Sequence, residues 1–448
     1  MFNSDETIVA IATANGIGSI SIVRVSGSLA LEIAKQISKK DNFIPRVATL
    51  TYLYNSQNEP IDEAIVLYFK APFSFTGEDI IEFQCHGGVA VSNLIIDEVL
   101  KLGARMATAG EFSKRAFLNN KIDLSKAEAI SKIIESRSSD AVKLMARQLK
   151  GEIKEFVEDI REDLLFMLAY TEVSIDYAED DLPKDIFNKI EEKIEKIVLK
   201  LRHTLESSKR REGLIDGFKL AIIGKPNVGK SSLLNKLLNY DRAIISSIAG
   251  TTRDTIEESV RIGSHIVKIV DTAGIREDTS DLIEKIGIEK SINAIDEADI
   301  IVALFDNSKK IDNEDKKILE LLNESTKKNI IKVLNKSDLE NSFEKNILED
   351  FIELSTKNSI DTLLKKIQLI LDENSFEDEL ILISKRQISS VQNCLDNILL
   401  SKQPLYSTEL ELFAYHINEA LYEISNITKP YDNDEMLDVM FGEFCLGK

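Results

Sequence analysis

Hydrophobic residues in the first 118 positions follow two different spacings. Four runs rich in apolar and β-branched residues are typical of short strands, and they occupy residues 7–13, 19–25, 63–69 and 80–84. Two further stretches, 29–37 and 91–102, place their apolar residues on one face of a helix. This mixture predicts a small α+β domain over residues 1–118.

From residue 119 onwards the apolar residues follow helical spacing. Three stripes come first: Ile122, Leu124, Ala127, Ile130 and Ile134; Ile153, Phe156, Val157, Ile160, Leu164 and Leu168; and Ile186, Ile190, Ile194, Ile197, Val198 and Leu201. Two more lie near the C-terminus: Ile388, Val391, Leu395 and Ile398; and Leu410, Phe413, Ile417, Leu421 and Ile424. Amphipathic helices need a partner that buries their apolar stripe. We therefore expect residues 119–216 and 373–448 to pack together as two halves of one helical domain.

The segment 217–372, inserted between the helical halves, contains a phosphate-binding motif. Residues 224–231 are Gly-Lys-Pro-Asn-Val-Gly-Lys-Ser, preceded by an apolar run typical of a buried strand and followed by helical spacing. Backbone N–H groups of such a loop and of a helix N-terminus bind anions. We expect Lys230 to reach the terminal phosphates of a nucleotide and the Ser231 hydroxyl to bind Mg²⁺. The flanking strand and helix disfavour the alternative, a chance glycine-rich turn.

A second motif indicates where the metal and the γ-phosphate lie. Residues 271–274, Asp-Thr-Ala-Gly, follow an apolar strand, which predicts Asp271 near the metal and Gly274 near the γ-phosphate. Thr252 lies between this motif and the phosphate loop, where a switch loop supplies a threonine hydroxyl to Mg²⁺.

A third motif indicates that the base is guanine. Residues 335–338, Asn-Lys-Ser-Asp, follow another strand. The Asp338 carboxylate can accept hydrogen bonds from N1–H and the 2-amino group of guanine, which adenine cannot donate, so a site built this way rejects adenine. The residues expected to line the GTP site are Asn227, Val228, Gly229, Lys230, Ser231, Ser232, Ser246, Ser247, Ile248, Ala249, Gly250, Thr251, Thr252, Asp271, Thr272, Ala273, Gly274, Asn335, Lys336, Asp338 and Ser355.

Composition narrows the classes of protein. The 448 residues, enough for two or three domains, carry 56 Lys and Arg against 76 Asp and Glu, a net charge of −20. That balance disfavours broad electrostatic binding to nucleic acid, but it leaves room for a local patch or a basic partner. Three cysteines without paired spacing predict neither a disulfide framework nor a zinc site. The absence of an 18-residue apolar run and the acidic start predict a soluble cytoplasmic protein.

Further motifs carry a resemblance that covers essentially the whole chain. They are residues 74–79 (Ser-Phe-Thr-Gly-Glu-Asp), 86–88 (His-Gly-Gly), 110–117 (Gly-Glu-Phe-Ser-Lys-Arg-Ala-Phe), 123–129 (Asp-Leu-Ser-Lys-Ala-Glu-Ala) and 444–448 (Phe-Cys-Leu-Gly-Lys). With these and the nucleotide motifs, the chain resembles the MnmE (TrmE) family of tRNA-modifying GTPases. Leu446 stands where isoleucine or valine is more familiar in the family, which is a conservative departure.

The resemblance implies a multidomain α/β protein with an N-terminal folate-binding domain that forms a homodimer, a central helical domain and an inserted Ras-like P-loop GTPase. Such proteins work with a flavin- and NADH-dependent partner, MnmG, as a heterotetramer. Together they add a carboxymethylaminomethyl or aminomethyl group at C5 of the wobble uridine of certain tRNAs. Whether this chain contacts tRNA itself or through the partner stays open.

The one-carbon donor implied by the resemblance is 5-formyl- or 5,10-methylene-tetrahydrofolate. The residues similar to the family's folate contacts are Arg24, Glu82, Lys121 and Lys448. A carboxylate such as Glu82 suits the amide and amino edge of a pterin, and cations suit the anionic glutamate tail.

The resemblance also implies that GTP hydrolysis depends on K⁺. Ile275 stands where many small GTPases carry a glutamine that orients water, and isoleucine cannot do so. Another positive charge must then offset the charge that develops on the β–γ oxygen. Asn227 resembles the family's K⁺ ligand, although it could be a simple turn residue. The remaining K⁺ ligands implied are the backbone carbonyls of Ser246 and Ile248 and the region of Thr251.

Two residues resemble catalytic residues of the family. Glu284 is expected to position the attacking water through a second water, with Glu277 and Asp281 as nearby alternatives. Cys445 is nucleophilic only as the thiolate, which Lys448 could favour by lowering its pKa. The thiolate could attack C6 of the target uridine or transfer the one-carbon unit. The alternative for Cys445 is a small apolar residue that packs the C-terminal tail.

The sequence allows two alternatives to a tRNA-modifying GTPase. A regulatory GTPase of ribosome assembly would share the nucleotide motifs, but such proteins usually carry a basic RNA-binding module, and this acidic chain shows none. A folate-binding scaffold with a vestigial GTPase is disfavoured because Lys230, Ser231, Thr252 and Asp271 are all intact.

Overall fold

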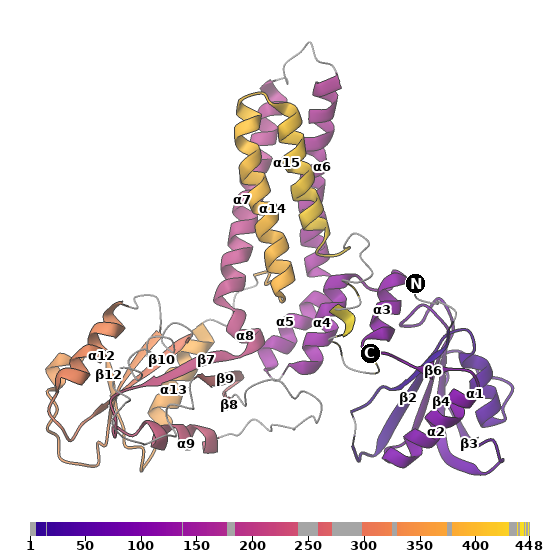
Figure 1. The fold of residues 1–448 in the computed structure, drawn as a ribbon, viewed down its shortest axis with the longest axis horizontal. Coiled ribbons are helices and arrows are strands. Elements are labelled where there is room, and N and C mark those ends of the chain that lie inside the picture. The colour runs from indigo at the N-terminus through magenta and orange to yellow at the C-terminus, as the bar shows by residue number, and fades with distance from the viewer. Residues whose placement is uncertain are drawn as a thin grey trace, which may run out of the picture. The chain divides into compact units, whose positions relative to one another are not determined.

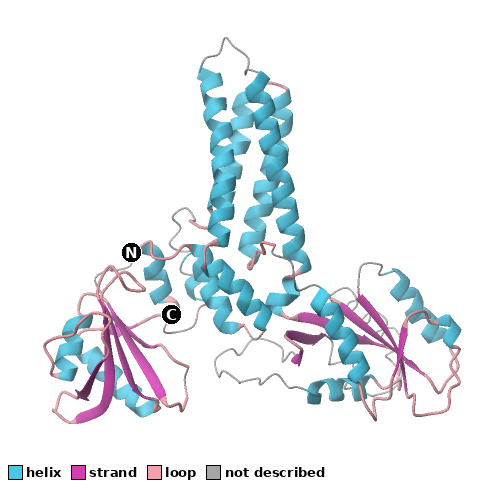
Figure 2. Ribbon diagram, turned by 180° about the vertical axis from the view of Figure 1, so that it is seen from behind, coloured by secondary structure: helices cyan, strands magenta, loops and turns pink. Residues whose placement is uncertain are grey.

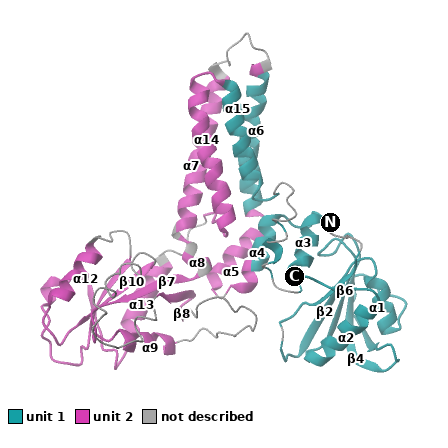
Figure 3. Cartoon of the chain, viewed as in Figure 1, with its two compact units in different colours: residues 1–131, 153–173, 410–448 teal, residues 132–152, 174–409 magenta. Residues whose placement is uncertain are grey.

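A computed structural model describes residues 6–14, 16–136, 138–176, 184–240, 259–270, 298–324, 329–373, 379–429, 437, 440–442, 444 and 447. The chain divides into two compact units, each assembled from segments that are distant in sequence (Figure 3). The first comprises residues 1–131, 153–173 and 410–448, and the second comprises residues 132–152 and 174–409. The four domain ranges expected from the sequence stay a prediction.

The first unit contains a six-stranded sheet with the strand order β3-β4-β5-β2-β1-β6. The strands are β1 (Ile8–Ile11), β2 (Ile20–Ser26), β3 (Thr49–Tyr54), β4 (Pro60–Phe69), β5 (Ile80–His86) and β6 (Arg105–Met106). Neighbours are antiparallel except β1 and β6, which are parallel. Strands β1, β2, β4 and β5 confirm the four predicted strands, whereas β3 and β6 were not predicted.

Helices α1 (Ala30–Ser38) and α2 (Val89–Lys101) confirm the two predicted helices and cover one face of this sheet (Figure 1). Their apolar residues share a core with Val23 and Val25 of β2 and with Phe83 of β5. Because side chains alternate along a strand, Arg24 belongs to the opposite face. The antiparallel register pairs Arg24 with Glu82 on the neighbouring strand.

Further described helices of the first unit are α3 (Glu111–Leu118), α4 (Leu124–Glu135), α6 (Glu152–Asp176) and α15 (Leu410–Ser425). The C-terminal end of α4 and both ends of α6 belong to the second unit. Arg161 on α6 donates a hydrogen bond from Nη1 to Ser425 Oγ on α15, which joins residues from the two helical halves of the sequence. Near the C-terminus, Phe441 and Phe444 pack in one apolar cluster with Leu124 of α4.

The second unit contains a six-stranded sheet with the order β12-β11-β10-β7-β9-β8. The strands are β7 (Phe218–Ile223), β8 (Ser259–Ile262), β9 (His265–Val270), β10 (Ile300–Asp306), β11 (Asn329–Asn335) and β12 (Phe351–Glu353). All neighbours are parallel except β8 and β9. Because β9 and β10 lie on opposite sides of β7, the strand order reverses there, and open α/β sheets bind ligands at such a point.

Helices cover both faces of this sheet (Figure 2). α9 (Lys230–Tyr240) and α13 (Asp361–Glu373) share one apolar core, and α12 (Asn313–Glu324) packs in a second core that includes Phe305 and Leu334. A short 3₁₀ helix, η1 (Lys345–Ile347), precedes β12. The strand and helix predicted on either side of the phosphate loop are β7 and α9, which confirms the context that the motif requires.

The second unit also holds α5 (Ser139–Leu149), α7 (Lys184–Arg210), α8 (Glu212–Asp216) and α14 (Lys385–Tyr406). α7 and α14 lie side by side, with the rings of Phe187 and Tyr406 5.8 Å apart between centroids and with hydrogen bonds from Tyr406 to Glu191 and from Lys402 to Glu195 (Figure 1). This pairing agrees with the predicted association of the helical halves. Within the described part of the chain, no helix is long and apolar enough to cross a membrane.

Candidate functional site

The phosphate loop joins β7 to α9 through backbone conformations that favour glycine. Gly224 has φ of +154° and Gly229 has φ of +106°. A Cβ on Gly224 would lie 2.7 Å from the backbone oxygen of Leu304, and one on Gly229 would lie 2.2 Å from the Asn335 side-chain nitrogen. Both glycines therefore allow neighbouring segments to approach the loop closely. Asn227 also has a positive φ, of 61°.

Lys230, the first residue of α9, folds over this loop. Its Nζ donates hydrogen bonds to the backbone oxygens of Gly224 at 2.7 Å and Lys225 at 2.9 Å. These contacts place an ammonium group directly over the loop, beside the N-terminus of α9. Ser231 follows in the first turn of the same helix. The loop, the ammonium group and the helix N-terminus together form a site suited to an anion.

Asn335 braces the phosphate loop from the end of β11. Its Nδ2 donates to the backbone oxygen of Val228 at 2.7 Å, and its Oδ1 accepts from the backbone N–H of Thr356 at 3.0 Å. The residue is 0% exposed, so these hydrogen bonds are made away from water and satisfy buried polar groups. Asn335 thereby connects the phosphate loop to the segment after β12, which contains Ser355.

Asp338 and Ser355 lie together at this edge of the sheet. Ser355 Oγ donates to Asp338 Oδ1 at 2.6 Å, and this hydrogen bond holds the pKa of the carboxyl below its usual range. Lys336 Nζ, two residues earlier, donates to the backbone oxygen of Asn227 at 2.7 Å and to Asp306 Oδ2 at 2.7 Å. The three segments that carry the predicted base and phosphate contacts therefore meet at one place, with an ionised carboxylate available at Asp338.

Lys225 is a residue of this site that sequence reasoning missed. Its Nζ lies 2.6 Å from Asp312 Oδ2 and 2.6 Å from Asp315 Oδ2. The hydrogen bond from Lys225 lowers the pKa of Asp312. A lysine directly after Gly224, the first glycine of the motif, could have drawn attention to this position. Its two partners, however, lie more than 80 residues away in the sequence.

Several predicted residues of the nucleotide site lie outside the described residues, so their placement stays a prediction. They are Ser246, Ser247, Ile248, Ala249, Gly250, Thr251, Thr252, Asp271, Thr272, Ala273 and Gly274, together with Glu284 and its alternatives Glu277 and Asp281. Among the described residues, no group of His, Cys, Asp and Glu side chains is arranged to hold a metal ion.

Arg24 and Glu82 form an ion pair on the face of the first sheet that α1 and α2 leave uncovered. Arg24 Nε donates to Glu82 Oε1 at 3.0 Å, and Nη2 lies 2.9 Å from the same oxygen. The guanidinium carbon is 6.0 Å from the ring centroid of Phe75 and 5.8 Å from that of Phe112. The face thus presents opposite charges beside two aromatic rings.

Two other parts of the first unit lie against segments that flank this ion pair. Lys121 lies against the loop before β5, because a Cβ on Gly77 would be 2.9 Å from Lys121 Cε. The C-terminal tail reaches β1, because a Cβ on Gly447 would be 2.1 Å from the backbone oxygen of Ile11. Cys445 and Lys448 lie outside the described residues, next to the described Phe444 and Gly447.

A buried ionic cluster supports the same region. The carboxylate of Glu111, at the start of α3, accepts from Arg105 Nη2 at 2.7 Å and from Arg115 Nη2 at 2.9 Å. Burial alone would raise the pKa of Glu111, but hydrogen bonds from Arg105, the Thr108 backbone and Arg115 lower it to about 2. Arg115 also donates to Glu78, which holds the loop before β5. This cluster explains how Glu111 and Arg115 can carry charges inside a buried helix.

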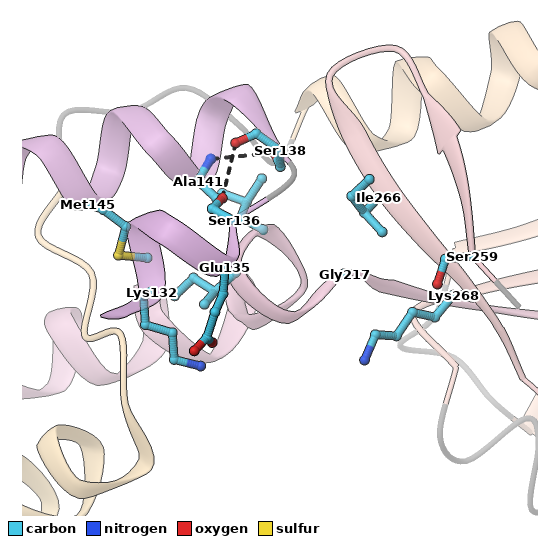
Figure 4. Close-up of a pocket in the computed structure, with 12 residues that line it drawn as sticks. Lys132, Glu135, Ser136, Ser138, Ala141, Met145, Gly217, Ser259, Ile266 and Lys268 are labelled. Carbon is cyan, nitrogen blue, oxygen red and sulfur yellow. Dashed lines mark hydrogen bonds between the residues drawn. The ribbon is translucent and has the colours of Figure 1, made fainter. Parts of the chain in front are cut away.

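A separate cavity of about 220 Å³ lies in the second unit, where α4 and α5 meet α8 and the β8–β9 hairpin (Figure 4). Lys132 and Glu135 line one side and Lys268 the other, while Ser138 caps α5 by accepting a hydrogen bond from the Ala141 N–H. Of the predicted site residues that the structure describes, none lines this cavity.

Comparison with known proteins identifies the family. Residues 7–121 match the family model described as the GTP-binding protein TrmE N-terminus, and residues 124–445 match that of the MnmE helical domain. The chain is 73% identical to the tRNA modification GTPase MnmE of Aliarcobacter butzleri (strain RM4018), with 100% of each chain covered. It is 58% identical to the protein of the same name from Sulfurimonas denitrificans, with 99% of this chain and 100% of that one covered. The chain belongs to the MnmE family of tRNA modification GTPases.

Membership of this family confirms the resemblance and the multidomain α/β fold class expected from the sequence. Among solved structures, that of a variant of Aquifex aeolicus Era bound to GDP·AlF₄⁻ is 27% identical over 41% of this chain and 67% of that one, with a TM-score of 0.26.

Proposed function

We propose that this chain, a GTP-hydrolysing enzyme by its family, uses GTP in a K⁺-dependent reaction that supports modification of the wobble uridine of tRNAs. The observation that carries the proposal is the buried Asn335. It joins the phosphate loop to the segment that contains Ser355, and it does so in a chain whose full length matches tRNA modification GTPases.

Different residues of the second unit are proposed to bind the phosphates and the guanine base of GTP. Backbone N–H groups of the phosphate loop and of the first turn of α9 bind the phosphates, and the Lys230 ammonium group offsets their charge. The Asp338 carboxylate accepts from the N1–H and 2-amino group of guanine, while Ser355 keeps that carboxylate oriented through its hydrogen bond. The scaffold around Asn335 holds these two parts at a fixed separation.

Two cations complete the proposed site. The Ser231 hydroxyl lies in the first turn of α9, and with Thr252 it offers the oxygen ligands that Mg²⁺ prefers. Asn227 is exposed, and its backbone is fixed by the hydrogen bond from Lys336, which supports its proposed role as a K⁺ ligand with Ser246, Ile248 and Thr251. K⁺ supplies positive charge next to the phosphates, and Glu284 is proposed to orient the attacking water.

The first unit is proposed to bind a formyl- or methylene-tetrahydrofolate. A flat pterin ring suits a carboxylate edge at Glu82, whose partner Arg24 lies beside the rings of Phe75 and Phe112. The anionic tail of the folate suits Arg24, Lys121 and Lys448. When bound, the folate supplies the one-carbon unit. The chain's own residues orient it, and Cys445 on the C-terminal tail is proposed to act on the uridine or on the carbon unit.

The same sheet face supports a homodimer. Leu50 and Ile65 are direct neighbours in the β3–β4 ladder, and both are exposed, as are Tyr52 and Ile20. Exposed apolar residues gathered on one sheet face mark interaction surfaces. We propose that two copies associate there and that the dimer works with a flavin-dependent MnmG-type partner as a heterotetramer, with tRNA bound by the assembly.

Steady-state GTP turnover in matched KCl and NaCl buffers tests the cation dependence. K⁺ is expected to raise kcat at saturating GTP, with Mg²⁺ present in both buffers and ATP giving no turnover. Equal kcat in the two salts would remove the proposed K⁺ site, while GTP turnover in either salt would leave the GTPase assignment intact.

A further inference from the structure

Lys225 ties the phosphate loop to the beginning of α12. Its ammonium group lies 2.6 Å from a carboxylate oxygen of Asp312 and 2.6 Å from one of Asp315. The Lys225 side chain is 7% exposed and that of Asp315 is 1% exposed. The Asp312 side chain is 52% exposed, so the buried part of the contact is the pair with Asp315. Burial reduces the screening that makes exposed ion pairs weak, so this pair holds the loop more firmly than a surface pair would.

The same two carboxylates cap α12. Asp312 Oδ1 accepts from the backbone N–H of Asp315 at 3.1 Å, and Asp315 Oδ2 accepts from the backbone N–H of Asp312 at 3.2 Å. This reciprocal arrangement satisfies N–H groups that have no partner within the helix. α12 is itself fixed to the sheet, since Leu322 packs in the core that contains Phe305 and Leu334. Lys225 is therefore anchored to a rigid element and not to another loop.

The backbone of Lys225 takes part in the phosphate site. Its carbonyl oxygen accepts one of the hydrogen bonds from Lys230 Nζ, at 2.9 Å, next to the bond to the Gly224 oxygen at 2.7 Å. A rotation of the chain at residue 225 would move this carbonyl and redirect the neighbouring N–H groups. The residue that is anchored through its side chain to Asp312 and Asp315 is thus the one whose backbone oxygen binds Lys230 in the loop.

We propose that Lys225, held by Asp312 and Asp315, is a positioning residue that keeps the first half of the phosphate loop in its nucleotide-binding conformation. This inference rests on the proposed function of the loop as the GTP site. Without the tether, the loop would occupy the binding conformation for only a fraction of the time, and apparent affinity falls by that fraction. GDP and GTP would lose affinity alike, because the loop must be ordered for both. Once nucleotide is bound, turnover proceeds normally, so KM rises and kcat does not fall.

The test measures Kd for a fluorescent GDP analogue and kcat at saturating GTP with the full-length chain. Lys225→Met is expected to raise Kd at least about tenfold and to leave kcat within about threefold of wild type, as reduced loop preorganisation predicts. Lys225→Arg keeps a buried cation that can bridge both carboxylates, and it is expected to restore Kd to within about threefold. The matched control is Lys345→Met, which breaks a partly exposed ion pair with Glu353 in the second unit. This variant is expected to leave Kd unchanged.

Lys225→Met could fail to fold, because it leaves the buried Asp315 carboxylate without its cation. A double variant then provides the test. Lys225→Met with Asp315→Asn removes both buried charges, and circular dichroism checks that the protein is folded at the assay temperature. A raised Kd in this folded double variant supports the positioning role. A lower melting temperature with Kd within about twofold of wild type would overturn it, because the tether would then contribute only to stability. Nucleotide binding by the wild-type chain, measured in parallel, tests the proposed function separately.

Discussion

Replacing Glu111 with glutamine tests the buried ionic cluster at the start of α3. Glutamine keeps the shape of the side chain and can still accept from the Thr108 N–H, but it removes the negative charge between Arg105 and Arg115. The pKa of Glu111 is lowered from 4.5 to about 2. One pKa unit corresponds to about 1.4 kcal/mol, so the ionised carboxylate stabilises this part of the first unit by about 3 kcal/mol near neutral pH.

Hydrogen exchange followed by mass spectrometry measures this loss locally, which suits a chain with two compact units. In Glu111→Gln, peptides that cover α3 and β6 are expected to exchange roughly a hundredfold faster, the equivalent of about 3 kcal/mol in opening free energy. Peptides from β10 and β11, in the second unit, provide the internal reference. Glu32→Gln is the matched control, because Glu32 is exposed and its contact with Lys35 is long at 4.0 Å, so exchange should change less than about threefold.

The pH dependence provides a second check with a defined sign. A carboxyl group whose folded pKa is depressed stabilises the fold above its unfolded pKa, and that stabilisation is lost as the pH falls through the folded pKa. For Glu111 the window runs from about 4.5 down to about 2. The difference between wild type and Glu111→Gln should therefore shrink steadily across this window. A difference that is small at pH 7, or that stays constant down to pH 2, would refute the assignment of the stabilisation to the ionised carboxylate.

Three further predictions concern the proposed site. Asp338→Asn should lower GTP affinity on the order of a thousandfold and favour xanthine nucleotides, because the amide presents a donor where the carboxylate accepts; unchanged GTP affinity in a filter-binding assay would contradict this. Glu284→Ala should lower kcat at least about a hundredfold with the Kd for GTP kept, and the same loss in Glu277→Ala with normal turnover in Glu284→Ala would move the role to Glu277. Cys445→Ala should abolish wobble-uridine modification while GTP turnover stays within about twofold, and normal modification in that variant would leave Cys445 a packing residue.

The elements flanking the phosphate loop could be predicted because their signals are local. The apolar run before Gly224 and the helical spacing after Ser231 correspond to β7 and α9. β3 was missed although Leu50, Tyr52 and Tyr54 suit a strand. Its core-facing side carries two threonines and a single apolar residue, Leu53, and the strand lies at the edge of the sheet. β6 has only two residues, which is too short for any periodic pattern.

The contacts that brace the site could not be predicted in this way, because they join positions far apart in sequence. Asn335 was expected at the nucleotide, and the structure shows its amide bonded to Val228 and Thr356. Lys225 pairs with Asp312 and Asp315. The spacing of these two aspartates in the sequence indicates a helix cap and gives no sign of a contact with Lys225. Motif spacing therefore predicts which residues serve the chemistry, whereas the residues that hold the loops in place could be identified only from the structure.

The most direct test of the proposed function is the chemistry of wobble uridines in cells that lack this protein. Nucleosides from purified tRNAs of a deletion strain, and of the same strain carrying the wild-type chain, would be compared by mass spectrometry. Aminomethyl-type groups at C5 of the wobble uridine are expected to disappear in the deletion strain and to return with the wild-type chain, but not with the Asp338→Asn variant. Wobble uridines that carry the same modification with and without the protein would contradict it.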